Sequence, residues 1–140
     1  MTAIWQVTLL GTVATTIVFF WMVAERNRRS RFSSRSVPKF GDWYRQYYGK
    51  DGNLPAHAVE AVVVEIARSI GIQPTQLRPA DRIDRELAIP EAKPLDDSIE
   101  IIESNICDKF DMKFDFPDDW QTLDDIIRGV VPIIQSNLRT

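Results

Sequence analysis

The chain opens with a long apolar stretch. Residues 3–24 carry no charge and are mostly apolar. A helix of that length would span about 33 Å, which is close to the thickness of a bilayer core. Trp5 and Trp21 lie near its two ends, where indoles favour the membrane interfaces. The pattern predicts a single transmembrane helix over residues 1–24.

Aromatic residues dominate the next periodic segment, which ends at a glycine-rich break over residues 49–53. They recur at helical spacing and predict a short amphipathic helix. Its aromatic face would pack on the domain that follows, lie in the membrane interface or bind a ligand; packing is the favoured interpretation. The aromatic positions are Phe40, Trp43, Tyr44, Tyr47 and Tyr48.

Three later stretches repeat apolar residues at i, i+3 and i+4, which is typical of helices that bury one face. The first begins near Ala56 and ends at Gly71, the second follows a cap at Asp96 or Asp97, and the third follows a cap at Thr122. Their apolar faces consist of Val59, Val62, Val63, Ile66, Ala67 and Ile70, then Ile99, Ile102, Ile106 and Phe110, then Leu123, Ile126, Ile127, Val130, Val131 and Ile134.

Two segments between these helices lack a continuous apolar face. Residues 72–87 carry isolated apolar side chains and predict a long packed loop, while residues 114–120 predict a short turn or a further short helix. No segment alternates convincingly enough to predict a strand. We therefore expect an all-α fold, with a transmembrane anchor (1–24), a basic tether (25–39), an aromatic juxtamembrane segment (40–53) and a helical domain (54–140).

Charge is distributed unevenly along the chain. Residues 1–24 carry none, residues 25–39 carry a net +5, and the remainder carries −8, which together give the overall −3. An acidic domain repels nucleic-acid phosphates and suits a basic protein surface. Positive residues after the apolar stretch mark a cytoplasmic end and argue against a cleaved signal peptide. We expect the N-terminus outside the membrane and the domain in the cytoplasm.

Candidate catalytic residues are sparse. Cys107 and His57 are each the single residue of their type, so an internal disulfide framework and a multi-cysteine zinc site are excluded. The adjacent carboxylates at 96–97 and 118–119 stand where helix caps and first-turn acids are expected. We therefore predict neither an enzyme nor a metal site.

Three stretches give the chain a resemblance to the acyl carrier protein family. Residues 62–72 resemble the first helix of that family and its glycine end, residues 108–114 the close of the second helix, and residues 122–127 the threonine-capped start of the last helix. The resemblance covers residues 56–137. It implies an acyl-carrier-like four-helix bundle.

The resemblance also implies a modification site. Members of the family that carry acyl chains hold 4'-phosphopantetheine on a serine that follows aspartate at the start of the second helix, and Asp97-Ser98-Ile99 matches that pattern. However, the interval from Ser98 to Phe110 is about two residues shorter than is usual in the family. Residues 88–95 insert extra loop, and counting back from Phe110 places Asp96 at the attachment position.

These observations favour a membrane-anchored docking module without cargo. Its acidic second-helix face would be formed by Glu100, Glu103 and Asp108, and would bind a basic partner such as an acyl-transfer or lipid-synthesis enzyme. One alternative is a true carrier with phosphopantetheine on Ser98 that feeds a membrane-localised acyl-transfer system. A second is a structural bitopic subunit of a membrane complex.

Overall fold

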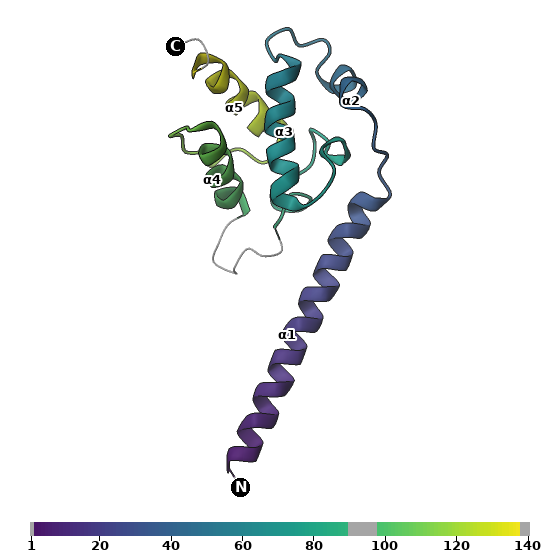
Figure 1. Cartoon of the computed structure of the whole chain (residues 1–140), viewed down its shortest axis with the longest axis vertical. Helices are drawn as coiled ribbons and strands as arrows, with labels where there is room; N and C mark the ends of the chain where they lie inside the picture. Colours follow the sequence, from purple (N-terminus) through teal and green to yellow (C-terminus); the bar gives the residue numbers. More distant parts are fainter. Residues whose placement is uncertain (1, 90–97, 138–140) are drawn as a thin grey trace. The chain divides into compact units, whose positions relative to one another are not determined.

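The computed structural model describes residues 2–89 and 98–137 and divides the chain into two compact units, Met1–Ser34 and Arg35–Thr140. Every regular element longer than an isolated bridge in the described residues is helical (Figure 1). The predicted all-α class is confirmed for these residues.

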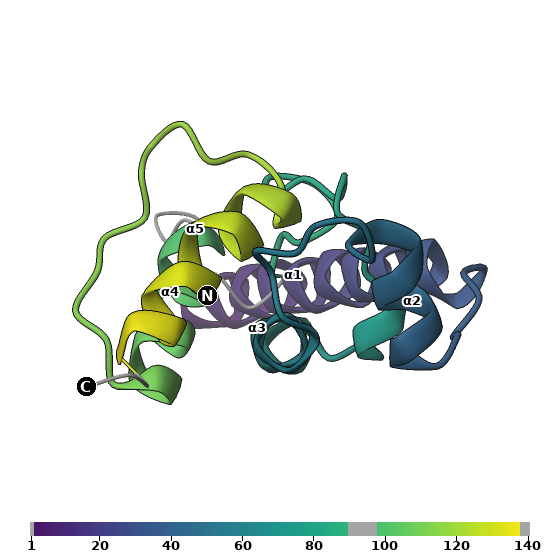
Figure 2. The ribbon, with the colours of Figure 1, turned by 90° about the horizontal axis from the view of Figure 1, so that it is seen from above.

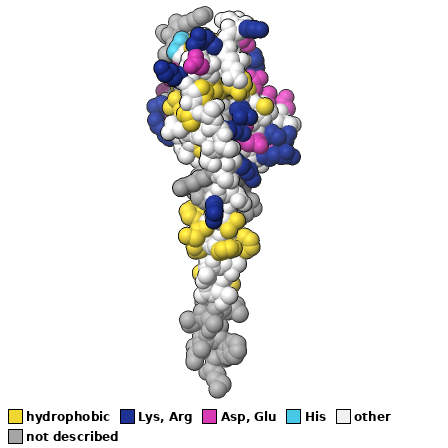
Figure 3. All heavy atoms as spheres, turned by 90° about the vertical axis from the view of Figure 1, so that its right-hand side faces the viewer, with side chains coloured by type: hydrophobic (Ala, Val, Ile, Leu, Met, Phe, Trp, Pro, Cys, Tyr) yellow, Lys and Arg dark blue, Asp and Glu magenta, His cyan; other side chains and the backbone are white. Residues whose placement is uncertain are grey.

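The first unit consists of α1 (Thr2–Ser33). Between Val13 and Val23 this helix exposes large apolar side chains, which appear as apolar patches in Figure 3. The hydroxyls of Thr15 and Thr16 each donate a 2.7 Å hydrogen bond to the carbonyl four residues earlier in the same helix.

The predicted transmembrane anchor is wrong. In residues 2–89 and 98–137, no helix is both long and apolar enough to cross a membrane. The apolar stretch is part of a longer helix, because α1 continues without a break into the arginine-rich residues after Glu25. The orientation and the cytoplasmic location of the domain stay predictions.

The second unit contains α2 (Phe40–Tyr47), α3 (Ala56–Ile70), α4 (Ser98–Phe110), α5 (Leu123–Asn137) and the short 3-10 helix η1 (Pro74–Gln76). Helix α3 is central because α4, α5, η1 and α2 all contact it (Figures 1 and 2). Figure 2 also shows that the segment after α4 extends away from the helices before it reaches the start of α5.

Helix α3 and the loop after it follow the sequence pattern. The helix buries the predicted apolar face and ends at Gly71, whose φ of 80° is left-handed backbone that favours glycine. In the loop, Leu77 and Leu87 are fully buried and Ile83 nearly so. These isolated side chains anchor a segment that has little regular structure of its own.

The aromatic segment packs on the helical domain. Trp43 and Tyr48 are each 1% exposed, and the indole Nε1 of Trp43 donates a 2.7 Å hydrogen bond to the carbonyl of Leu77. A buried indole needs such a partner because an unpaired N–H is costly. Of the three alternatives for this segment, the contacts of Trp43 and Tyr48 correspond to packing.

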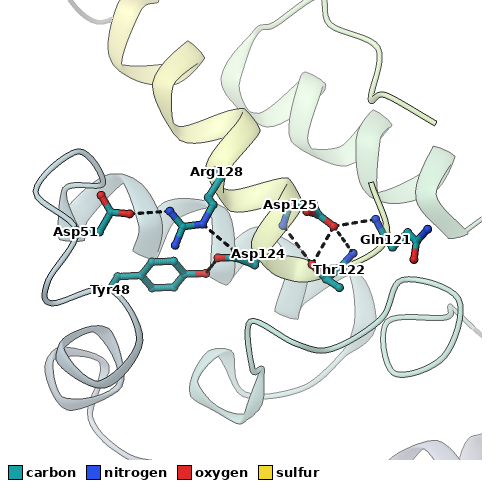
Figure 4. A network of polar contacts seen from close by, with 7 residues as sticks. All are labelled: Tyr48, Asp51, Gln121, Thr122, Asp124, Asp125 and Arg128. Atoms are coloured by element: carbon teal, nitrogen blue, oxygen red, sulfur yellow. Dashed lines mark hydrogen bonds and ion pairs between the residues drawn. The ribbon is translucent and has the colours of Figure 1, made fainter. Parts of the chain in front are cut away.

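The start of α5 is held by two sets of polar contacts, drawn in Figure 4. Asp125 accepts hydrogen bonds from the backbone N–H groups of Gln121 and Thr122 and from the Thr122 hydroxyl, while that hydroxyl accepts the N–H of Asp125. This reciprocal arrangement is the predicted threonine cap.

The second set joins α5 to the aromatic segment. The Tyr48 hydroxyl donates to Asp124 over 2.7 Å, and the Arg128 guanidinium donates to both Asp124 and Asp51. Arg128 also lies 5.7 Å from the centre of the Tyr48 ring. Together these contacts fix the end of α2 and the following turn against the last helix.

Three sequence predictions around α4 need comment. Phe110 is half-buried, unlike the fully buried Ile102 and Ile106. Residues 114–120 form the turn alternative, because Pro117 restricts the backbone before it and the Phe116 N–H donates to Glu103 instead of to a helix. The caps proposed at Asp96 and Asp97 lie outside the described residues.

Candidate functional site

All four predicted site residues lie on α4. Ser98 begins the helix, Glu100 and Glu103 follow within its first two turns, and Asp108 lies near its end. Glu100 and Asp108 are exposed, whereas Ser98 and Glu103 are half-buried. Glu100 and Glu103 line one pocket, whereas Ser98 and Asp108 do not.

Ser98 has a structural contact of its own. Its hydroxyl oxygen accepts a 3.0 Å hydrogen bond from the backbone N–H of Ile89, which fastens the start of α4 to the end of the preceding loop. The contact uses one acceptor lone pair of the hydroxyl and not its O–H, and the side chain is half-buried. Attachment of phosphopantetheine to Ser98 stays a prediction.

Glu100 and Glu103 border an open pocket of about 470 Å³ that we call the α4 pocket. Three segments form it: the loop around Ile83, the N-terminal half of α4, and the segment before α5. The first and third are joined by a bridge between Arg82 and Thr122 and by the hydrogen bond from Ile83 N–H to the Gln121 carbonyl. The lining residues are Arg82, Ile83, Asp84, Ile99, Glu100, Glu103, Asp115, Phe116, Pro117, Asp118, Trp120 and Gln121.

Aromatic side chains form one wall of the α4 pocket. The ring centres of Phe116 and Trp120 are 4.9 Å apart, and Phe114 extends the cluster at 5.9 Å from Trp120. Phe116 is only 7% exposed, while Trp120 is half-exposed. Trp120 therefore offers more accessible aromatic surface than Phe116 does.

Acidic side chains surround this wall. The lining includes five carboxylates and one guanidinium, a net charge of −4. That guanidinium, Arg82, donates to both carboxylate oxygens of Asp84 over 2.9 and 3.0 Å. Its hydrogen bond holds the pKa of Asp84 below its ordinary value. Arg82 thus compensates Asp84 and leaves the acidic side of α4 unbalanced within the pocket.

Glu103 has two roles in the α4 pocket. Its carboxylate accepts the N–H of Phe116 over 2.5 Å, which holds the aromatic segment against α4, and it also contributes negative charge. Asp108 does not line the pocket. Two of the three predicted docking residues therefore share one site, and the third lies apart from it.

The sequence pattern contained a signal for the aromatic wall. Residues 114–120 combine three aromatic with three acidic side chains, the two residue types that form the wall and its charged surroundings. Nothing in the sequence indicated that this segment meets the loop at 82–84, because that juxtaposition depends on a pairing between residues about forty positions apart.

Cys107 has the surroundings of an unreactive thiol. Burial raises its pKa, and its Sγ–H donates a 3.2 Å hydrogen bond to the carbonyl of Phe114. A thiol held in its protonated form is a weak nucleophile. Among the described residues, no group of three or more histidine, cysteine or acidic side chains is arranged to hold a metal ion.

Comparison with known proteins gives no match: neither a family model, nor a curated protein, nor a solved structure is similar to this chain. The resemblance to acyl carrier proteins stays a prediction that rests on the residues quoted for it.

Proposed function

We propose that the helical unit is a docking module that binds a basic surface of a partner protein through the α4 pocket. The observation that carries the proposal is the coincidence of a net charge of −4 with an accessible aromatic wall in a single pocket. Opposite charge accelerates encounter and orients the partner, and an aromatic surface that can be desolvated supplies the contact.

The contacts of Ser98 favour docking over carrying. In a carrier, the serine hydroxyl is the attachment point, and every step of the function depends on it. Here that hydroxyl accepts the Ile89 N–H, a role that fastens a loop. This contact gives Ser98 a structural role that needs no attached cargo, and the docking role uses the exposed Glu100 beside the aromatic wall.

A charge reversal in the full chain tests this proposal. The probe is a fluorescein-labelled peptide of alternating lysine and alanine, and its binding is followed by fluorescence anisotropy. Glu100→Lys should weaken binding roughly five- to thirty-fold, because an attraction of up to about 1 kcal/mol is replaced by a comparable repulsion. The loss should shrink toward 1 M salt, where the Debye length falls to about 3 Å.

Two matched variants complete the design. Glu60→Lys makes the same charge change at an exposed position of α3 outside the α4 pocket and should weaken binding much less. Ser98→Ala should leave the affinity unchanged. Equal losses for Glu100→Lys and Glu60→Lys would reduce the interaction to net charge and reject the pocket as the docking site.

A further inference from the structure

Trp120 connects the α4 pocket to the core of the helical unit. A Cβ atom built on Gly129 of α5 would lie 1.9 Å from Cζ2 and 2.1 Å from Cη2 of the indole. The six-membered ring therefore lies directly against the α5 backbone, where glycine alone leaves room. Phe116 and Phe114 confine the indole further. The indole is therefore held between the α5 backbone and two phenylalanine rings.

The charges around the Trp120 ring are mostly negative and would attract a cation. Glu100, Asp115 and Asp118 line the same pocket and are exposed. Arg82, the single lining residue with positive charge, is committed to Asp84. A cation that entered would meet the Trp120 indole, the best type of aromatic partner for cations, and carboxylates at the same time.

Building on the proposed function, we propose that the α4 pocket receives an arginine side chain of the partner, with the guanidinium against Trp120. A guanidinium is planar, stacks on aromatic faces and presents a fork of N–H donors that matches carboxylates. A lysine ammonium is more strongly hydrated and acts as a point charge. The combination of indole and carboxylates therefore favours arginine over lysine at equal charge.

The experiment compares two peptides of equal length and charge, one of alternating arginine and alanine and one of alternating lysine and alanine, binding to the full chain. We expect the arginine peptide to bind about tenfold more tightly, which lies within the range that cation–π contacts give. In Trp120→Leu the two affinities should converge, because the arginine peptide loses its advantage. Trp120→Phe, which keeps an aromatic face, should retain part of the preference and guards against a variant that fails to fold.

The outcomes separate the two proposals. Equal binding of both peptides by the unmodified chain would overturn the arginine site and leave the acidic docking module standing. An arginine preference that survives in a folded Trp120→Leu chain would also overturn the arginine site and leave the docking module standing. If neither peptide binds at low salt, the docking function itself fails, and the arginine site fails with it.

Discussion

Gly129 is the position where a small change has the most specific structural consequence. Replacing a glycine inside a helix by alanine ordinarily stabilises it by up to about 1 kcal/mol. At Gly129 the added methyl would lie 1.9 Å from the Trp120 ring, whereas carbon atoms in contact lie about 3.5–4.0 Å apart. The indole would have to move by roughly 1.5 Å or more.

That displacement sets the expected magnitude. Overpacking a closed contact costs about 1–3 kcal/mol, and loss of the aromatic contacts of Trp120 with its neighbours adds about 0.5–1.5 kcal/mol. Against the helix gain of about 1 kcal/mol, we expect Gly129→Ala to destabilise the chain by roughly 1–3 kcal/mol. Gly41→Ala is the matched control, since that helical glycine has nothing within 4 Å of its added Cβ; it should be neutral or stabilising.

Urea unfolding of the full chain, followed by tryptophan fluorescence and circular dichroism, measures both variants. The double variant Gly129→Ala with Trp120→Leu should be less destabilised than the sum of its single variants, because removing the ring removes the collision. If Gly129→Ala proves as stable as Gly41→Ala, the placement of the indole against α5 is refuted.

Three further predictions concern stability. Ile102→Ala should cost about 2–5 kcal/mol because the side chain is fully buried, and Phe110→Ala should cost less than this because Phe110 is half-buried; urea titration compares them, and a larger loss for Phe110 would contradict the packing. Arg35→Met should cost about 3–5 kcal/mol, because it strands the 4%-exposed Asp81 without its ion-pair partner at 2.7 Å; adding Asp81→Asn should recover part of the loss in thermal unfolding. Burial raises the pKa of Asp125, but the hydrogen bonds that its carboxylate accepts outweigh burial and place the pKa below its ordinary value. This stabilisation exists above pH ~4 and disappears as the pH falls through the lowered pKa. The cost of about 1 kcal/mol for Asp125→Ala at pH 7 should therefore shrink in acid, and a cost independent of pH would contradict this role of Asp125.

Local sequence signals predicted the helices well where propensity, periodicity and caps agreed. Helix α3 runs from Ala56 to its left-handed glycine, and α5 begins directly after Thr122 with the reciprocal cap in place. These elements follow from interactions between residues a few positions apart, which a single sequence contains.

The transmembrane anchor predicted over residues 1–24 was wrong. The prediction rested on the absence of charge over residues 3–24 and on the length of that stretch. No helix in residues 2–89 and 98–137 is both long and apolar enough to cross a membrane.

The candidate site was predictable only in part. Glu100 and Glu103 followed from the polar side of an amphipathic helix, but Asp108 was assigned to the same face and lies outside the α4 pocket. Trp120 and Phe116 were missed as lining residues because their positions depend on contacts between different segments. Glu103 accepts the backbone N–H of Phe116, and the Trp120 indole lies against the backbone of Gly129. Spacing along the chain contains no information about either.

The docking account is tested most directly by titrating the full chain, labelled with ¹⁵N on its tryptophans, with the alternating arginine and alanine peptide. The indole N–H signal of Trp120, assigned with Trp120→Phe, should shift in proportion to occupancy. The signal of Trp43 should stay in place, because that N–H is buried and bonded to the Leu77 carbonyl. Saturable binding that leaves the Trp120 signal unmoved would contradict the account.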